Sequence, residues 1–204
     1  MYHRGVERGG RGTCYPRAMN PLSPEIWNQG LLYENYRRTV RRNGKVLDEV
    51  YRNPIHTAED VEVLRPLPPL WILAIGEDWC PDVYHTLPTW ARIAKELPGW
   101  ELRVFPRDGH QELMRHFLWR KENLRIPVYA FYDEALRLQT WWSGRSALAE
   151  RALQELNGGR PFGELSPQER TRVGEAFEEG YRSHFRRANL DEILAQLRAF
   201  FHVG

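Results

Sequence analysis

The segment WILAIGEDWCPD, residues 71–82, decides the fold class of this protein. It begins with the apolar run Trp71 to Ile75, which follows prolines and precedes Gly76, as is typical of a strand buried on both faces. Pro81 suits the first turn of a helix, because that turn does not need its N–H. Apolar residues then recur every three or four positions. The segment therefore predicts a buried strand, a short loop and a helix over residues 80–97.

The rest of the chain continues this alternation. Glu101 to Pro106 alternates enough to predict a strand, and Asp108 can cap a helix after it. Val128 to Tyr132 is a second wholly apolar run, hence another central strand. Leu136 to Trp142 alternates as an antiparallel outer strand does, and Ser146 to Leu156 predicts a helix. This order predicts an α/β fold with a central mixed sheet flanked by helices.

Helical extensions are expected on both sides of this core. The four predicted regions are a disordered tail (1–21), an N-terminal helical extension (22–70), the α/β core (71–157) and a C-terminal helical extension (158–204). The N-terminal extension opens with a helix from Ser23 to about Asn43, because Ser-Pro-Glu is a favourable helix start and Asn-Gly a favourable end. In the C-terminal extension, Ser166 begins a capping box, and Asn189 is predicted to cap the last helix.

Composition excludes several functional classes. The formal net charge of +2 over 204 residues gives no reason to expect a nucleic-acid or membrane partner. No run of 18 apolar residues is present, and the N-terminus lacks the apolar core of a signal peptide, so a cytoplasmic location is expected. Two cysteines, Cys14 and Cys80, cannot form a disulfide framework or a four-ligand zinc site. No metal and no cofactor are expected.

Cys80 stands where the buried strand gives way to the helix. Free backbone amides and the positive end of the helix dipole stabilise an anion at such a position, so they lower the pKa of a thiol. A cysteine needs this setting to be a thiolate near neutral pH, whereas a structural cysteine does not. Asp82 is predicted in the first turn, where an acid favours the helix but opposes ionisation of the thiol.

At this point the sequence resembles the thioredoxin family. Gly76-Glu77-Asp78-Trp79-Cys80-Pro81 is similar to its strand–loop–helix active site, with a tryptophan before the nucleophile. Pro88 stands where thioredoxin helices carry a kinking proline, and Ile126-Pro127 matches the cis-proline that faces the cysteine. Gly144 follows the final strand, as in the family. The nearer resemblance is to a bacterial thioredoxin-like subgroup with a Glu-Asp-Trp-Cys-x-Asp segment and an extra N-terminal helical region.

The chain also departs from the dithiol thioredoxins. Their second cysteine would fall at Val83, and their buried acid would fall at Ala74. A dithiol enzyme releases its mixed disulfide because the second thiol is held at high effective concentration, and this chain lacks that step. The site residues that the resemblance implies are Cys80 as the catalytic residue, Trp79, Pro81, Ile126 and Pro127 for substrate binding, and Asp82 as a modulator of the thiol.

Two functions from different classes stay open. The first is a single-cysteine thiol–disulfide oxidoreductase: Cys80 attacks a disulfide or thiol adduct, and glutathione or another low-molecular-weight thiol resolves the intermediate. The second is a non-enzymatic binding module or redox-inactive adaptor that holds a protein partner in the thioredoxin groove. Val83 and Ala74 favour the binding module, whereas Cys80 after Trp79 at a helix start favours the enzyme. The balance from sequence leans narrowly to redox chemistry.

Overall fold

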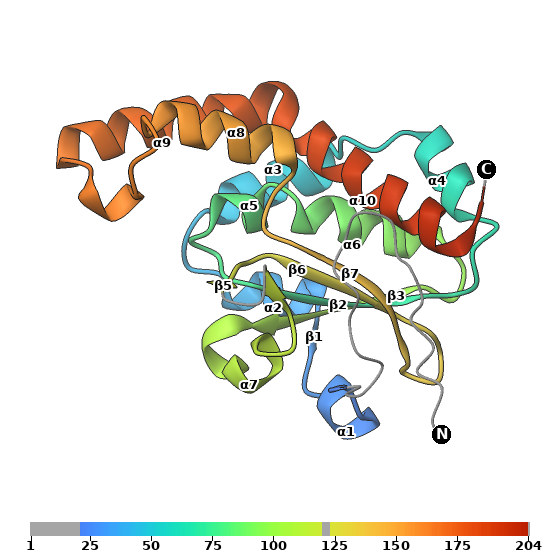
Figure 1. Ribbon diagram of the computed structural model, residues 1–204. Coiled ribbons are helices and arrows are strands. Elements are labelled where there is room, and N and C mark those ends of the chain that lie inside the picture. The colour runs from blue at the N-terminus through green and yellow to red at the C-terminus, as the bar shows by residue number, and fades with distance from the viewer. Residues whose placement is uncertain (1–20, 120–122, 204) are drawn as a thin grey trace, which may run out of the picture.

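The computed structural model describes residues 21–119 and 123–203 (Figure 1). Its centre is a five-stranded mixed sheet with the strand order β1-β3-β2-β6-β7. These strands are β1 (Leu31–Leu32), β2 (Trp71–Gly76), β3 (Glu101–Pro106), β6 (Val128–Tyr132) and β7 (Leu138–Ser143). Strands β2 and β3 are parallel, and the other neighbouring pairs are antiparallel. The α/β prediction with a mixed sheet is confirmed, and the two wholly apolar runs are the central strands β2 and β6.

Helices cover both faces of this sheet, and Figure 1 shows α3, α5, α6 and α10 on one side with α1 and α7 on the other. The α-helices are α1 (Pro24–Trp27), α2 (Tyr33–Thr39), α3 (Gly44–Arg52), α4 (Ala58–Leu64), α5 (Pro81–Tyr84), α6 (Leu87–Glu96), α7 (Gln111–Met114), α8 (Ala147–Leu156), α9 (Pro167–Gly180) and α10 (Arg186–Phe201). The short elements are the 3₁₀ turns η1 (Arg107–Gly109) and η2 (Phe162–Glu164), the π-helical segment η3 (Tyr181–Phe185), and a two-stranded ribbon of β4 (Leu118–Trp119) and β5 (Asn123–Leu124).

The predicted helix over residues 80–97 is interrupted. It forms α5 and α6, which are separated by His85 and Thr86. The break lies just before Pro88, which has no N–H to donate to the preceding turn. The Thr86 hydroxyl donates to the backbone oxygen of Asp82 at 2.5 Å, so a side chain satisfies the carbonyl at the break. The helix expected after Asp108 is displaced in a similar way: η1 comes first, and α7 begins at Gln111.

The prediction of one helix from Ser23 to Asn43 is wrong. Ser23 does cap a helix, but α1 is only one turn long, and Leu31 then pairs with Val104 as the edge strand β1. Gly30 permits this path, because a Cβ at this residue would lie 2.4 Å from Phe105 Cζ. The chain therefore passes close under the sheet here, and only glycine fits. The N-terminal segment contributes to the sheet as well as to the helical layer.

The C-terminal helices form a long arm. Figure 1 shows α8 and α9 side by side and projecting beyond the edge of the sheet, with α10 returning across one face. The capping box at Ser166 is confirmed, because its side chain and that of Glu169 satisfy each other's backbone N–H groups. Asn189, however, caps nothing: α9, η3 and α10 run on without a break, and Asn189 lies buried inside α10.

Two further predictions concern the N-terminal tail and membrane-spanning helices. The predicted disordered tail falls almost wholly outside the described residues. No helix in the described part of the chain is long and apolar enough to cross a membrane.

Candidate functional site

Cys80 is the N-cap residue of α5, as predicted, and it lies under the surface with a relative exposure of 6%. Its Sγ lies 3.8 Å from the backbone oxygen of Ile126. The Ile126-Pro127 peptide bond is cis, which confirms the prediction, and the loop that contains it faces the thiol. Gly144, with a φ of +79°, donates its N–H to the Pro127 oxygen at 2.8 Å. The first residue after β7 therefore holds the proline loop in place beside the thiol.

The surroundings of Cys80 oppose its ionisation. Burial, assisted by the negative charge of Asp82, raises the pKa of the Cys80 thiol to about 12. The backbone N–H groups of Val83 and Asp82 and the guanidinium of Arg145 act in the opposite direction, because each stabilises a negative sulfur. Burial and the carboxylate outweigh the helix N-terminus. The resting thiol is therefore protonated.

Asp82 does not lie on the surface of the first turn. It is only 1% exposed, and its Oδ2 lies 2.6 Å from Arg145 Nη2. The Tyr181 hydroxyl donates to Asp82 Oδ1 from 99 residues further along the chain. Burial raises the pKa of Asp82, whereas Arg145 and Tyr181 stabilise its charged form. Arg145 also approaches Glu150 of α8 at 3.9 Å, so the C-terminal arm is connected to the residues beneath the thiol.

The next polar residues of α5 also contact the C-terminal arm. Tyr84 donates its hydroxyl to Glu178 Oε1, and His85 Nε2 lies 2.8 Å from Glu178 Oε2. The His85 ring stacks on Tyr181 with their centroids 4.5 Å apart. Every polar side chain from Asp82 to His85 is thus bonded to, or stacked on, a residue that lies at least 60 positions later. The arm is part of the site.

The loop before Cys80 is held by neighbouring loops. The carboxylate of Asp78 accepts hydrogen bonds from the backbone N–H groups of Arg41 and Arg42 at 2.8 and 2.9 Å. Trp79 is 42% exposed and its ring stacks with the Arg107 guanidinium, 5.2 Å from the ring centroid. Trp79 is therefore an exposed apolar surface next to the thiol. An aromatic that is held but exposed is suited to binding another molecule.

The positions that distinguish dithiol thioredoxins are filled by packing. Val83 is 1% exposed and lies against Gly76, where an added Cβ would meet the Val83 Cγ1 at 2.7 Å. Ala74 is fully buried in β2. Pro81 begins α5, as predicted. A resolving thiol and a buried acid on β2 are therefore replaced by apolar contacts, and the acid near the thiol is Asp82 on α5.

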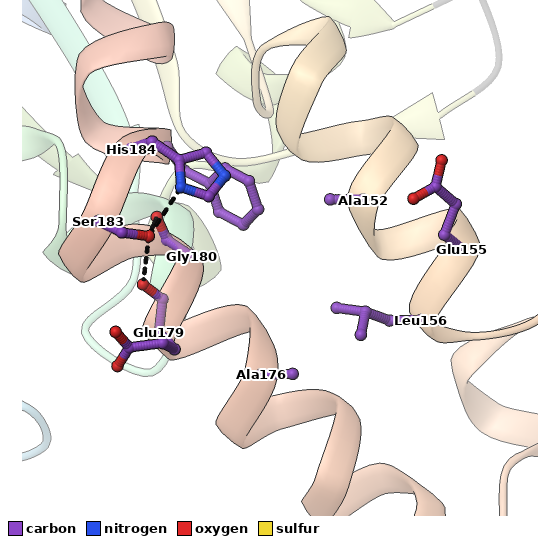
Figure 2. A pocket seen from close by; sticks show the side chains of 9 residues that line it. Ala152, Glu155, Leu156, Ala176, Glu179, Gly180, Ser183 and His184 are labelled. Atoms are coloured by element: carbon purple, nitrogen blue, oxygen red, sulfur yellow. Dashed lines mark hydrogen bonds between the residues drawn. The ribbon is translucent and has the colours of Figure 1, made fainter.

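A separate hollow of about 460 Å³ lies between α8 and the segment α9–η3. Figure 2 shows Ala176 and the His184 ring on one helix towards Ala152 and Leu156 on the other, whereas the Glu179 carboxylate points away from them. Ser183 Oγ lies 2.7 Å from His184 Nδ1 and 2.8 Å from the backbone oxygen of Glu179, so the hydroxyl is engaged within its own helix. None of the lining residues belongs to the Cys80 site. Within the described residues, no three His, Cys, Asp or Glu side chains gather as a metal site requires.

Sequence reasoning placed Trp79, Cys80, Pro81, Ile126 and Pro127 together, but it missed the polar groups that hold Asp82. One feature of the sequence could have indicated Arg145. It follows Gly144 directly after the last strand, and the end of that strand lies near the N-terminus of the helix that begins after Cys80. Tyr181 and Glu178 had none, since they lie in a helical extension whose docking face could not be inferred from spacing.

A cysteine at a helix N-terminus, facing a cis-proline at the edge of a mixed sheet with helices on both faces, defines a thioredoxin fold. The family model for thioredoxin matches residues 31–157, more than half of the chain, and the protein therefore belongs to the thioredoxin family.

Solved structures agree with this fold. A crystal structure of an HIV epitope-scaffold has 16% sequence identity and a TM-score of 0.57, and the match covers 85% of this chain and 96% of that chain. The 1.5 Å crystal structure of PA1234, a protein of unknown function from Pseudomonas aeruginosa, has 17% identity and a TM-score of 0.55, with 87% and 98% covered. At such identities the likeness concerns the fold alone. No curated protein matches the sequence significantly.

Proposed function

We propose that this protein is a thioredoxin-fold binding protein in which Cys80 stays a protonated thiol and a protein segment binds beside Trp79 and Pro127. The observation that carries the proposal is the burial of Cys80, with its pKa at about 12. The thiolate is the nucleophile in disulfide exchange, and at pH 7 such a group is ionised in only about one molecule in 10⁵, against a few per cent for an ordinary cysteine. That difference of about three orders of magnitude favours binding over catalysis.

The surface beside the thiol supports the same proposal. Trp79 offers a large exposed ring, and aromatic side chains are enriched where proteins bind one another. Arg107 limits its movement by stacking on it, which reduces the entropy that binding must cost. The resemblance to thioredoxins adds that the cis-proline loop holds the backbone of a bound chain. The occupant is therefore an extended segment of a protein partner.

A second candidate, the single-cysteine oxidoreductase, is favoured by one specific observation. The N–H groups of Asp82 and Val83 lower the pKa of Cys80, so the sulfur is the acceptor at a helix N-terminus. In this reaction the Cys80 thiolate attacks a disulfide or a glutathione adduct, the new S–S bond forms and the leaving thiolate departs. An external thiol such as glutathione then attacks the mixed disulfide, which regenerates Cys80 and leaves the external thiol oxidised.

The alkylation rate of Cys80 as a function of pH separates the two candidates. The Cys14→Ser variant makes Cys80 the only reporter of reaction with iodoacetamide, and the Cys14→Ser/Cys80→Ser variant gives the background. We expect an inflection above pH 10 and no mixed disulfide with oxidised glutathione near neutral pH until the protein is unfolded. An inflection at or below that of free cysteine, about 8.5, together with rapid formation of the adduct, would assign the protein to the oxidoreductases.

The binding face is tested with a peptide library panned against the protein. Peptides that bind beside the thiol should lose affinity for Trp79→Ala and keep it for Cys80→Ser, because no sulfur chemistry is involved. Phe162→Ala is the matched control, since Phe162 is 49% exposed but lies in η2 on the C-terminal arm. Equal losses in Trp79→Ala and Phe162→Ala, or a requirement for the thiol, would contradict the proposed mode of binding.

A further inference from the structure

A second, much smaller hollow lies where the start of α6 meets α10. Its lining residues are His85, Thr86, Thr89, Trp90, Arg186, Asn189 and Leu190. Four of them point to a ligand because each carries a buried side-chain atom without a hydrogen-bond partner among the described residues. These atoms are His85 Nδ1, Thr89 Oγ1, Arg186 Nε and Asn189 Nδ2. Leaving even one buried polar group unsatisfied costs about 1–3 kcal/mol, so four around one hollow need a common explanation.

Three of these side chains are almost completely enclosed. The relative exposures of His85, Thr89 and Asn189 are 3%, 3% and 1%. Their other polar atoms are already in use or cannot replace the missing bond: His85 Nε2 bonds to Glu178, and Asn189 Oδ1 accepts from the backbone N–H of Ser146 at 2.7 Å. A hydrogen bond from the Asn189 side chain to the Tyr181 hydroxyl oxygen lowers the pKa of Tyr181, although burial raises that pKa overall. The Asn189 amide nitrogen carries two hydrogens, so one of them remains for the hollow.

The hydrogen-bonding roles of the four atoms follow from their partners. Burial would raise the pKa of Glu178, but His85 and Tyr84 outweigh it and hold that pKa below its ordinary value, so Glu178 is a carboxylate and only accepts. His85 Nε2 therefore carries a hydrogen towards Glu178, and in the neutral form of the ring Nδ1 is then an acceptor. Arg186 Nε and Asn189 Nδ2 can only donate, whereas the Thr89 hydroxyl can accept.

We propose that one water molecule binds in this hollow. It accepts from Arg186 and Asn189 and donates to His85 Nδ1 and Thr89 Oγ1, which uses both its hydrogens and both its lone pairs. The hollow offers about 10 Å³ to the centre of a water molecule, enough for one. A halide cannot donate to Nδ1 of a neutral His85, and a cation does not fit beside two groups that only donate.

This water connects elements that position the thiol, independently of what binds beside Trp79. His85 directly follows α5, whose first turn holds Cys80, and Thr89 lies in α6. Arg186 and Asn189 belong to α10. The bound water therefore orients the His85 ring, and it joins α10 to α6 in addition to the direct contact between His85 and Glu178.

A high-resolution crystal structure of the full chain tests the proposal. We expect a single peak within hydrogen-bond distance, about 2.7–3.2 Å, of all four atoms. The ¹⁵N chemical shifts of His85 should show a protonated Nε2 and an unprotonated Nδ1. An empty hollow, direct bonds among the four side chains, or an anomalous peak there after a bromide soak would each overturn the assignment.

Two variants sharpen this test. Thr89→Ile keeps a β-branched side chain but removes the hydroxyl and extends into the hollow, so water ¹⁷O relaxation dispersion should lose one long-lived water. Thr86→Val is the matched control, because Thr86 lines the same hollow but its hydroxyl already bonds to the Asp82 oxygen and the Tyr129 hydroxyl. Loss of the same water from both variants, or from neither, would contradict the proposed site. If Thr89→Ile fails to fold, the wild-type density decides alone.

Discussion

Replacing Asp82 with asparagine should change stability and thiol chemistry together, since one carboxylate serves both. The Asp82–Arg145 pair is buried on the acid side, with side-chain exposures of 2% and 19%. Removing one member of such a pair costs about 3–5 kcal/mol, because the other charge stays buried. Arg145 keeps Glu150 at 3.9 Å, so we expect the lower end, about 3 kcal/mol. For a chain of this length that lowers Tm by about 6–12 °C.

The same substitution should lower the pKa of Cys80. The Asp82 charge is the second cause of the raised pKa, after burial, and its removal leaves the positive charge of Arg145 near the sulfur balanced only by Glu150 at 3.9 Å. We expect the pKa to fall from about 12 by on the order of one to two units, which raises the thiolate fraction about 10- to 100-fold at a given pH. Burial is unchanged, so the value should stay above that of free cysteine.

The assay is the pH dependence of alkylation in the Cys14→Ser background, paired with thermal unfolding. Asp78→Asn is the control, because Asp78 lies two residues before Cys80 but bonds to the N–H groups of Arg41 and Arg42 and is not among the main causes of the raised Cys80 pKa. It should leave the alkylation profile in place. A Cys80 pKa that is unchanged or higher in Asp82→Asn would refute the argument that the buried carboxylate holds the thiol protonated.

Three further predictions follow from other contacts. Gly144→Ala should destabilise the fold by about 1–2 kcal/mol in chemical denaturation, because φ is +79° and the new Cβ would lie 3.3 Å from a neighbouring side chain. Gly163→Ala is the control, and it should leave the free energy of unfolding almost unchanged because its Cβ would have no neighbour within 4 Å. Arg187→Met removes hydrogen bonds of 2.6 and 2.9 Å to Asp60 and should cost about 1–2 kcal/mol at pH 7, less than a fully buried pair because Arg187 is one-third exposed. Burial would raise the pKa of Asp60, but Arg187 and Thr57 outweigh it and lower that pKa. The wild-type protein should therefore exceed Arg187→Met in free energy of unfolding by the full amount above about pH 4, and this difference should shrink as acid protonates Asp60. A difference in free energy of unfolding that grows in acid would contradict this. Val83→Cys should form a disulfide with the thiol three residues before it, yet reduce insulin with dithiothreitol no faster than the parent; a clear gain would favour the oxidoreductase.

The amino-acid sequence determined the order of strands and helices and the position of the thiol. The apolar runs at Trp71 to Ile75 and Val128 to Tyr132 suit only strands buried on both faces, and prolines mark the starts of the elements beside them. These local signals predicted the first turn of α5, and the resemblance to thioredoxins added the cis-proline loop next to Cys80. They did not reveal β1, since two residues are too few for a periodic pattern and their pairing depends on Gly30 passing beneath Phe105.

Tertiary structure alone decided the state of the thiol. In a helix first turn Asp82 is expected to be exposed and screened by solvent, but the C-terminal arm covers it, and Arg145 and Tyr181 approach it from 63 and 99 residues further along the chain. No spacing or periodicity encodes such a meeting, because it depends on how α9 and α10 pack against the core. Burial removes water from the Cys80 sulfur and places it beside the Asp82 carboxylate. In such a medium of low polarity, the free-energy cost of a thiolate exceeds the stabilisation that two backbone N–H groups at the helix N-terminus provide, so the pKa of the thiol rises.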